Sequence, residues 1–547
     1  MKKINNLIKI MVLFGVISFT SCETTELDLT ENPNALSPSQ ADPDFFLNFV
    51  QVNFASFVES TGSFGGRLTR VQYMNGRDYL NAYSANSFNG IWSTAYSTIM
   101  KDLSTMNTLA EEKGMNNHIA MGKVMQAYVM ITLVDLFGDV PYTEALDFNI
   151  LNPNLDPGAD VYAAALTLLD EAIAGFDNNA PDPQYDFYYN RNWDGWIKAA
   201  NSIKLKAYSA TRLVDPAAVG NFNAIIASGN YITNNSEDFQ FQWGTQLTTP
   251  DTRHPSYRSD YTRTGGNSYR SNWLMNHMRG DFPSALLELD PRVFSYFYRQ
   301  VGATPGIDAP ANEEVLECGL IAPPAHYAGY VYCSPPWGWW GRDHGNDNGI
   351  PPDGFMRTLV GVYPAGGAID ELSPTAQTLN DGRGGDGITP VLLASWIDFW
   401  IAEQKALIDN DMIAAKTFTF NGMVKSINKV WDFEINPGVT PLVKNWFLAD
   451  MDAKWNASTD EERKEIMSTQ FFVATYGNSI DAYNFYRRTG YPKTLQPNIE
   501  PNPGNFPKSM WLPANSANNN ANINQKSDLS VQVFWDNNPT TGFPVAN

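Results

Sequence analysis

The chain contains 547 residues, with 58 Asp and Glu against 37 Lys and Arg, and carries a formal net charge of −21 at pH 7. This balance argues against a nucleic-acid-binding protein, because recognition of the phosphate backbone requires a basic patch. It also disfavours strongly anionic polysaccharides unless local basic residues or a cation intervene, and it leaves neutral glycans and peptides open as ligands.

The N-terminal segment has the pattern of a lipoprotein signal peptide. Two lysines precede an apolar stretch from Leu7 to about Phe19, which is too short for an ordinary membrane-spanning helix. The sequence FTSC at 19–22 resembles a bacterial lipobox, in which cleavage precedes a cysteine that then carries acyl chains. We expect residues 1–21 to be a signal peptide and Cys22 to hold the lipid anchor. The alternative is a plain secreted protein with a chance cysteine.

A polar segment follows the lipobox. Residues 22–44 are rich in Pro, Asn and acidic side chains, a composition that suits a tether between the lipid and a folded body. No Pro/Ser-rich linker interrupts the remainder, so we expect residues 45–547 to form one domain with long insertions.

Four long segments have the apolar spacing of helices. They are His118 to Phe137, Asp160 to Phe176, Asp194 to Val214, and Val391 to Ile408, the last beginning after Pro390. Small residues where helices can cross are typical of tetratricopeptide-type hairpins, although the period is irregular. Long Gly-, Asn- and aromatic-rich stretches at 215–275, 300–390 and 490–547 separate or follow these helices. The predicted fold class is therefore mostly α, with elaborate loops.

Cys318 and Cys333 are the only cysteines besides Cys22. They flank a Pro/Gly/aromatic segment that lacks the periodicity of a helix. The expected secretion would place them outside the cytoplasm, where disulfides persist. We predict a disulfide between them, worth about 3 kcal/mol in the chain-entropy picture. Two free buried thiols are the alternative, and a zinc site lacks the further ligands it would need.

The segment around the second cysteine is crowded with aromatic residues. Tyr330, Trp337, Trp339 and Trp340 lie there together with Gly and Pro, in a loop that can present flat rings to a sugar. All four are candidate ligand-binding residues, and one hypothesis is that at least one of Trp337, Trp339 and Trp340 lines a ligand cleft while others pack. The other is a satellite hydrophobic cluster under the loop, organised by the disulfide, and the pattern does not decide between them.

Several sequence motifs along the chain resemble those of a known family. They are DLFGDVPY at 135–142, WIKAANSIKLK at 196–206, DPR at 290–292, GRDHGNDNGIPPDGFMRTLVGVYPAGG at 341–367 and RRTGYP at 487–492. Together with the lipobox, and in this order, they resemble the SusD/RagB family of Bacteroidetes surface lipoproteins over essentially the whole mature chain.

The resemblance implies both a fold and a role. The fold would be four tetratricopeptide-like helix pairs, with a loop-rich, aromatic-bearing face that carries short strands. The role would be to capture an oligosaccharide or peptide outside the outer membrane and pass it to a SusC-like TonB-dependent transporter. The expected location is the outer membrane, with a lipid anchor and the body facing outward.

The resemblance also points to a second ligand-facing region at residues 67–92. There Tyr73, Tyr79 and Trp92 are candidates for stacking, and Asn81 is a candidate for hydrogen bonds to hydroxyl or peptide groups. An amphipathic helix that uses these rings for core contacts is the alternative.

The sequence offers little support for catalysis or a cofactor. No G-x-S-x-G or H-E-x-x-H motif occurs, and the G-x-G-x-x-G match at 382–387 lacks a preceding strand. Asp343, Asp347 and Asp353 offer oxygen ligands that can suit calcium, but a solvated loop is the better interpretation because the EF-hand order fails. We predict a binding protein rather than an enzyme, with no cofactor. A peptide receptor of the same fold, a glycoside hydrolase and a purely structural surface protein are the alternatives, in that order.

Overall fold

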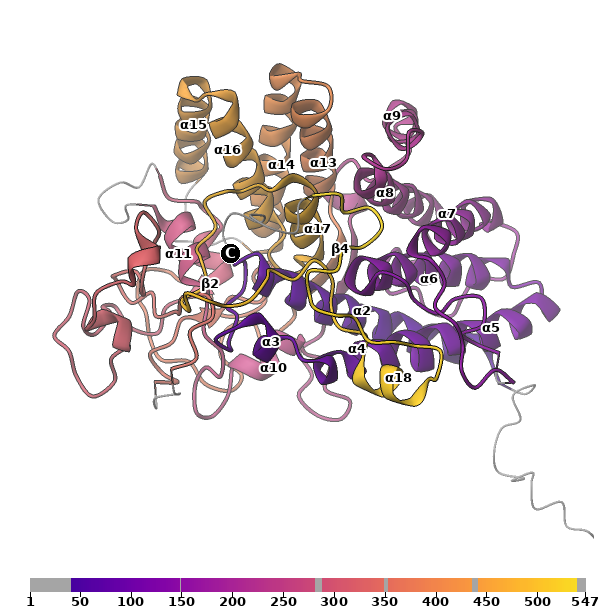
Figure 1. The fold of residues 1–547 in the computed structure, drawn as a ribbon, viewed down its shortest axis with the longest axis horizontal. Helices are drawn as coiled ribbons and strands as arrows, with labels where there is room; N and C mark the ends of the chain where they lie inside the picture. Colours follow the sequence, from indigo (N-terminus) through magenta and orange to yellow (C-terminus); the bar gives the residue numbers. More distant parts are fainter. Residues whose placement is uncertain (1–40, 148, 281–287, 349–352, 435–440, 539–547) are drawn as a thin grey trace, which may run out of the picture. The chain divides into compact units, whose positions relative to one another are not determined.

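Paired helices form the scaffold of the computed structural model of this chain (Figure 1). The structure describes residues 41–147, 149–280, 288–348, 353–434 and 441–538. Pro43–Asn547 forms one contact unit. Cys22 and the predicted signal peptide lie outside the described residues.

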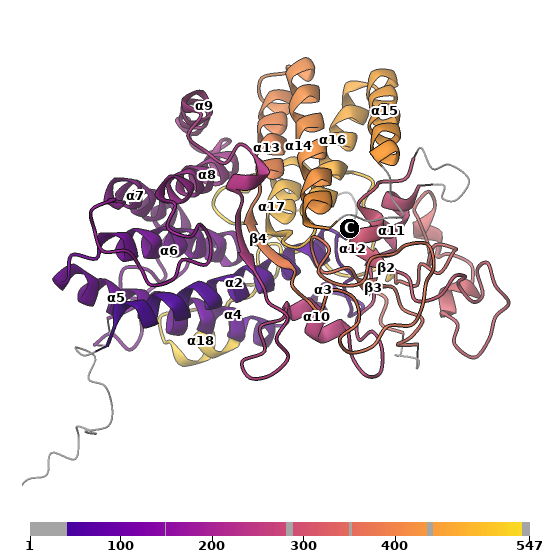
Figure 2. The same cartoon turned by 180° about the vertical axis from the view of Figure 1, so that it is seen from behind.

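The first group of long helices follows the chain from α2 to α9. They are α2 (Pro43–Leu68), α5 (Lys101–Glu112), α6 (Asn116–Phe137), α7 (Gly158–Gly175), α8 (Trp193–Thr211) and α9 (Ala218–Ser228). Consecutive members from α5 to α9 pack against each other, as Figures 1 and 2 show from opposite sides. The predicted helices at 118–137, 160–176 and 194–214 correspond to α6, α7 and α8. The prediction of a mostly α fold is confirmed.

The second group of long helices comes late in the chain. It contains α13 (Ala394–Leu407), α14 (Met412–Phe433), α15 (Pro441–Ala457), α16 (Asp460–Ala474) and α17 (Ile480–Thr489). In this group α13, α14 and α16 pack together, and α17 packs against α2. Local capping explains some of the ends: Thr459 and Glu462 form a capping box at the start of α16, and Gly490 ends α17 in the left-handed conformation.

The helix predicted from Val391 begins three residues later than expected. Residues Ile388–Leu392 form strand β4, which pairs antiparallel with β1 (Phe239–Gln242). The side chain of Asp238 then accepts the backbone N–H of Ala394 at 2.8 Å, which satisfies a donor in the first turn of α13. The tertiary pairing with β1 therefore overrides the helix-start signal of Pro390.

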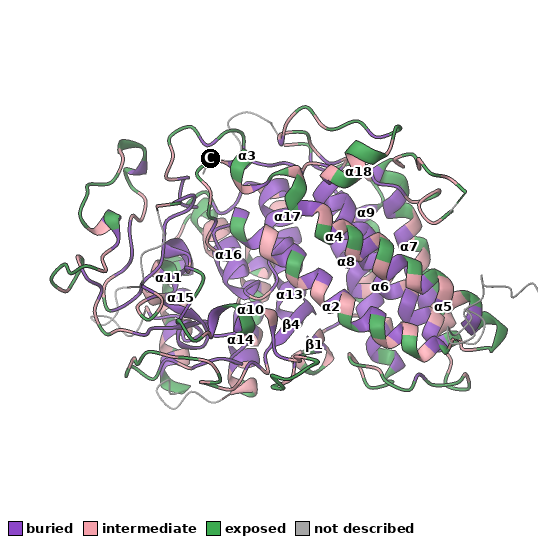
Figure 3. Ribbon diagram, turned by 90° about the horizontal axis from the view of Figure 1, so that it is seen from below, coloured by how far each residue is buried: buried purple, intermediate pink, exposed green. Residues whose placement is uncertain are grey.

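Short elements and irregular chain make up the rest of the described fold. They are α3 (Tyr79–Ala82), α4 (Asn89–Ser93), α10 (Pro255–Asp260), α11 (Asn272–Arg279), α12 (Val293–Tyr296), α18 (Ala514–Asn519) and a second two-stranded sheet of β2 (Phe297–Tyr298) and β3 (Leu359–Val360). A π-helical stretch at Thr94–Met100 and four 3₁₀ turns complete the described elements: Ala85–Phe88, Asn235–Glu237, Glu317–Gly319 and Ala325–Tyr327. Figure 3 shows that the buried residues concentrate on the helices and that the exposed residues are frequent in these loops.

The helix α6 is the most deeply buried part of the first group. Its length and composition would allow it to cross a membrane, but 83% of its apolar window is buried inside the protein, as is usual for a core helix. Within it, Asp135 accepts hydrogen bonds from Tyr162, from Asn484 at 2.7 Å and from Trp535 at 3.0 Å. Asp135, the first residue of the DLFGDVPY motif, thus connects α6 with α7, α17 and the C-terminal segment through buried hydrogen bonds.

Candidate functional site

A cavity of about 540 Å³ opens at the end of α2, on the loop-rich side of the molecule. Its wall combines residues far apart in sequence: the end of α2 and the chain after it, the segment 254–271, residues 342–348 and the turn at 476–477. Polar side chains dominate, and five aromatic rings join them: Tyr73, Tyr269, Phe297, Tyr363 and Tyr476. This wall is more polar than that of a typical small-molecule site, which is mainly apolar with a few polar groups.

Two of the residues singled out from the sequence line this cavity, Tyr73 and Asn81. Tyr73 is half-buried, and its hydroxyl donates to the carbonyl oxygen of Asn346. Its ring meets that of Tyr269 edge to face, with 5.9 Å between the centroids. Burial raises the pKa of Tyr73 above its ordinary value. The side chain of Asn81 is exposed and its amide N–H donates to Asp78 at 2.7 Å, while its amide oxygen accepts no hydrogen bond from the described residues.

Tyr269 is held rigidly in the wall. Its hydroxyl donates to Asp353 at 2.6 Å, and the guanidinium groups of Arg342 and Arg357 each lie 4.1 Å from its ring centroid. Because these cations already interact with the ring, Tyr269 shapes the cavity and leaves stacking on a ligand to other rings.

The cavity also contains a serine, a histidine and a glutamate. The Ser256 hydroxyl donates to Glu59 at 3.0 Å, while Nδ1 of His254 accepts the backbone N–H of Ser256 at 3.1 Å. Burial lowers the pKa of His254, and its Nε2 lies 3.6 Å from Glu59. The serine hydroxyl thus bonds the carboxylate instead of the imidazole, and the three groups lack the nucleophile-to-base order of a hydrolytic triad.

The tryptophans of the aromatic loop lie elsewhere, and two of them are core residues. Trp339 and Trp340 are fully buried, so the hypothesis that they contact a ligand is wrong. The indole of Trp340 donates to Asp353 at 2.9 Å, and its ring packs with Tyr269, Leu316 and both cysteines. Trp339 lies under the Arg299 guanidinium, 5.0 Å from its ring centroid. Trp340 therefore belongs to a small hydrophobic cluster around the disulfide, which was the alternative interpretation of the aromatic loop.

The other aromatic candidates are not on the cavity wall. Trp337 is 42% exposed and Tyr330 is half-buried, both outside the lining residues. Tyr79 is fully buried and packs edge to face on Phe506, which corrects its assignment to the ligand site. Trp92 is half-buried against Phe137 and Tyr96, where it serves the helical core.

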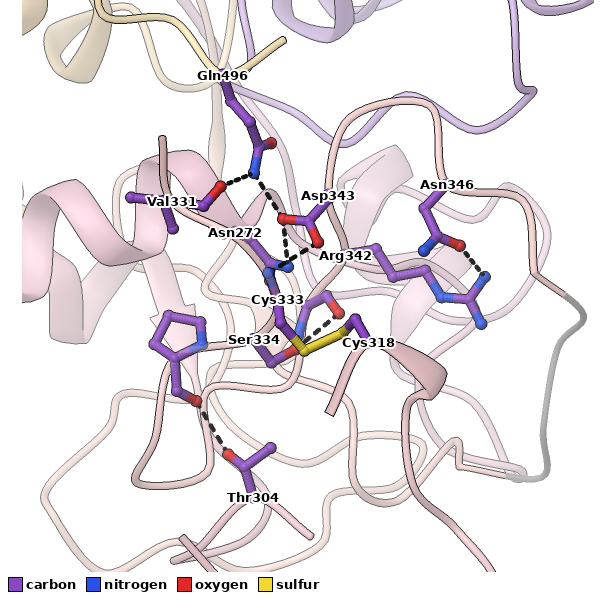
Figure 4. The surroundings of a disulfide bond; sticks show 12 residues. Asn272, Thr304, Cys318, Val331, Cys333, Ser334, Arg342, Asp343, Asn346 and Gln496 are labelled. Carbon is purple, nitrogen blue, oxygen red and sulfur yellow. Dashed lines mark hydrogen bonds between the residues drawn. A yellow bond between two sulfur atoms is a disulfide. The ribbon is translucent and has the colours of Figure 1, made fainter. Parts of the chain in front are cut away.

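Cys318 and Cys333 are joined by a disulfide, shown with its surroundings in Figure 4. Beside it, the buried Asp343 accepts hydrogen bonds from Asn272 at 3.1 Å, from Gln496 at 2.6 Å and from the backbone N–H of Cys333 at 2.9 Å. The disulfide and Asp343 therefore fix the loop that carries Arg342 to the cavity.

The three acids considered for calcium do not converge on one site. Asp343 has the partners just described, Asp353 is bonded by Arg357, Tyr269 and Trp340, and Asp347 is exposed and pairs with Arg77 at 2.7 Å. Among the described residues, no group of three or more His, Cys, Asp or Glu could hold a metal ion. Each carboxylate is used in an internal contact, so the calcium hypothesis is wrong for this trio.

Most of the cavity wall was not identified from the sequence. Arg67 begins the candidate region 67–92 but was not itself named as a ligand contact, and Arg270 and the 254–271 segment lie in a stretch that we recognised only as a long loop. The available signal was compositional, since SDYTRTGGNSYRSN at 259–272 is dense in Ser, Tyr, Arg and Asn. Only the fold shows that this loop meets the end of α2.

A helical scaffold that carries a polar cavity between its loops defines a ligand-binding protein, and the comparisons with known proteins agree. The family model described as starch-binding associating with outer membrane matches residues 33–313, and the model described as SusD and RagB outer membrane lipoprotein matches residues 436–536. The first model covers more than half of the chain, so the protein belongs to the SusD/RagB family. The descriptions of the family are of binding and outer-membrane lipoproteins and not of catalysis.

Solved structures share the fold at low identity. A chitin-binding protein is 18% identical with a TM-score of 0.63, over 91% of this chain and 100% of that one. A chitin-binding SusD homologue from Flavobacterium johnsoniae is 16% identical with a TM-score of 0.61, over 90% and 98%. A SusD homologue from Bacteroides uniformis is 19% identical with a TM-score of 0.62, over 90% and 100%. No curated protein sequence matches the chain.

Proposed function

We propose that this chain is a surface lipoprotein that binds an oligosaccharide in the cavity at the end of α2 and delivers it to a SusC-like TonB-dependent transporter. The observation that carries the proposal is the cavity itself, because it combines hydroxyl, amide and guanidinium groups with aromatic rings on the loop face of a SusD/RagB fold. Such groups match the hydroxyls and the apolar ring faces of a sugar. Two structural neighbours described as chitin-binding support the glycan class.

Titration calorimetry of the full-length chain in mild detergent tests binding. The panel holds neutral oligosaccharides (chitin, starch and plant cell-wall fragments), acidic oligosaccharides and short peptides, and each ligand is analysed for cleavage afterwards. We expect one oligosaccharide class to bind at micromolar concentration and to be recovered uncut. Recovery of shortened products would instead support the glycoside hydrolase alternative.

Variants then locate the site. Tyr73→Ala and Asn81→Ala should each weaken binding about tenfold or more, since each removes a polar group that can contact the sugar. Trp337→Ala is the matched control, because it removes an exposed ring outside the cavity. Loss of binding in Trp337→Ala alone would move the site to the aromatic loop and overturn the cavity assignment.

The arginines on the wall keep a peptide receptor as the second candidate, because guanidinium groups also bind carboxylates of peptides. Binding of peptides and of no oligosaccharide in the same panel would favour it. Delivery to a transporter is tested separately, by affinity purification of the membrane-solubilised chain from its native source followed by mass spectrometry of co-purifying membrane proteins.

A further inference from the structure

Positive charge gathers on the cavity wall of an otherwise acidic protein. Arg67, Arg270 and Arg342 line the cavity, whereas the whole chain has a net charge of −21. The acidic side chains on the same wall are Glu59 and Asp347. Asp347 is paired with Arg77, 2.7 Å away, so its charge is already balanced. The cavity wall is therefore more positively charged than the average surface of the protein, which favours an anionic ligand.

Arg67 is the clearest member of this set. It lies in the last turn of α2 and is exposed. Its guanidinium carbon lies 5.6 Å from the ring centroid of Phe64, and it forms no salt bridge with the described residues. A cation at a helix C-terminus is stabilised by the helix dipole, which accounts for its position. Its five N–H donors remain available to a ligand.

Arg270 adds donors that the protein only partly uses. Its Nη2 lies 3.5 Å from Asp260, and its positive charge opposes the rise that burial causes in the pKa of Tyr476, which lines the same cavity. The Nε–H of Arg270 is buried and has no hydrogen-bond partner among the described atoms. A donor buried this deeply is closed to a ligand, so Arg270 can meet an anion only through the rest of its guanidinium group on the cavity wall.

We propose that the oligosaccharide bound here carries an acidic group, the carboxylate of a uronic acid or a sulfate, and that Arg67 and Arg270 contact it. The inference rests on the proposed function, since it names the class of sugar within that role. Guanidinium groups bind planar carboxylates and tetrahedral sulfates through paired N–H donors. The glutamate at position 59 lies on the wall as well, but it bonds Ser256 and Thr389.

The test compares ligands that differ only in charge. Full-length protein is titrated with uronic-acid oligosaccharides and their carboxyl-reduced forms, and with sulfated oligosaccharides and their desulfated forms. We expect one acidic ligand to bind at least about tenfold more tightly than its neutral counterpart, and its affinity to fall as the salt concentration rises. A difference within the uronic-acid pair would identify a carboxylate as the acidic group, and a difference within the sulfated pair would identify a sulfate.

Variants connect the difference to the arginines. Arg67→Gln should abolish most of the preference for the acidic ligand, while Arg263→Gln, an exposed arginine of the same charge outside the cavity wall, should keep it. Equal affinities within every pair, or an equal loss for both members of a pair in Arg67→Gln, would overturn the acidic-sugar proposal and leave oligosaccharide binding intact. Absence of all oligosaccharide binding would overturn the proposed function itself.

Discussion

Trp337 and Trp340 stand three residues apart in one loop and make opposite contacts. Trp340 is fully buried and donates to Asp353, whereas Trp337 is 42% exposed and its backbone alone bonds Asp308 and Arg299. We expect Trp340→Ala to lower the free energy of unfolding by about 3–5 kcal/mol, because it leaves a large cavity. Trp337→Ala should change it by no more than about 0.5 kcal/mol. Urea unfolding of both variants measures the difference, and equal effects would contradict the burial described here.

Asp343 predicts a pH dependence of stability. Burial raises its pKa to about 6, against the hydrogen bonds from Asn272, Cys333 and Gln496 that lower it. Between about pH 4 and 6 the folded state therefore holds a proton that the unfolded state has lost, and this group lowers stability as the pH rises through that window. Relative to the wild type, Asp343→Asn should become more stable from pH 4.5 to 7.5. Parallel denaturant curves at both values test this, and a constant difference would refute it.

At the scale of residues, the sequence identified types of side chain better than their positions. Tyr73 and Asn81 reach the cavity, but Tyr79 and Trp340 point into the core. The direction of each ring depends on partners far away in the chain, such as Phe506 for Tyr79. No local pattern contains that information, and the same limit hid Arg270, whose place follows from where its loop meets α2.

At the scale of elements, helices with a continuous apolar stripe were predictable because their period is local. The predicted segments 118–137, 160–176 and 194–214 each match a helix to within three residues at either end. The start of α13 was missed because β4 forms only when β1, about 150 residues earlier in the chain, pairs with it. Whether such a short segment forms a strand depends on the strand with which it pairs, and the sequence alone does not identify that partner.

Glycines in α2 determine how closely α17 approaches. A Cβ added at Gly65 would lie 2.5 Å from the carbonyl oxygen of Ser479 and 2.8 Å from Cα of Ile480, both backbone atoms that cannot move independently. Gly65→Ala should therefore destabilise the protein by about 1–3 kcal/mol. Gly220→Ala in α9 is the matched control, since a Cβ there meets nothing within 4 Å and should stabilise the helix by about 0.5–1 kcal/mol. Thermal unfolding compares the two, and a neutral Gly65→Ala would show that the helices separate easily.

At the scale of the whole molecule, the cavity joins parts that the chain order keeps apart. The end of α2, the 254–271 loop, residues 342–348 and the turn before α17 all contribute to one wall. A ligand that binds only the folded form therefore raises the free energy of unfolding of the whole unit. At concentrations well above Kd, this increase grows with the logarithm of the ratio of ligand concentration to Kd. The net charge of −21 does not oppose the proposed acidic ligand, because the arginines act over a few ångströms while the acidic surface is screened by salt over about 10 Å.

The predicted anchor at Cys22 would hold this cavity at a membrane surface. Cys22→Ser replaces the sulfur atom to which we expect the lipid to attach, and with it would remove acyl methylenes worth about 0.8 kcal/mol each in the bilayer. We expect the wild-type chain to enter the detergent phase on phase separation, with an intact mass that lacks residues 1–21 and includes acyl chains. Cys22→Ser should lose the acyl mass and leave the detergent phase. The Cys318→Ser, Cys333→Ser double variant is the control, because it changes the other two cysteines and should keep both properties. Retained acyl mass and detergent partition in Cys22→Ser would place the attachment elsewhere and overturn the assignment to Cys22.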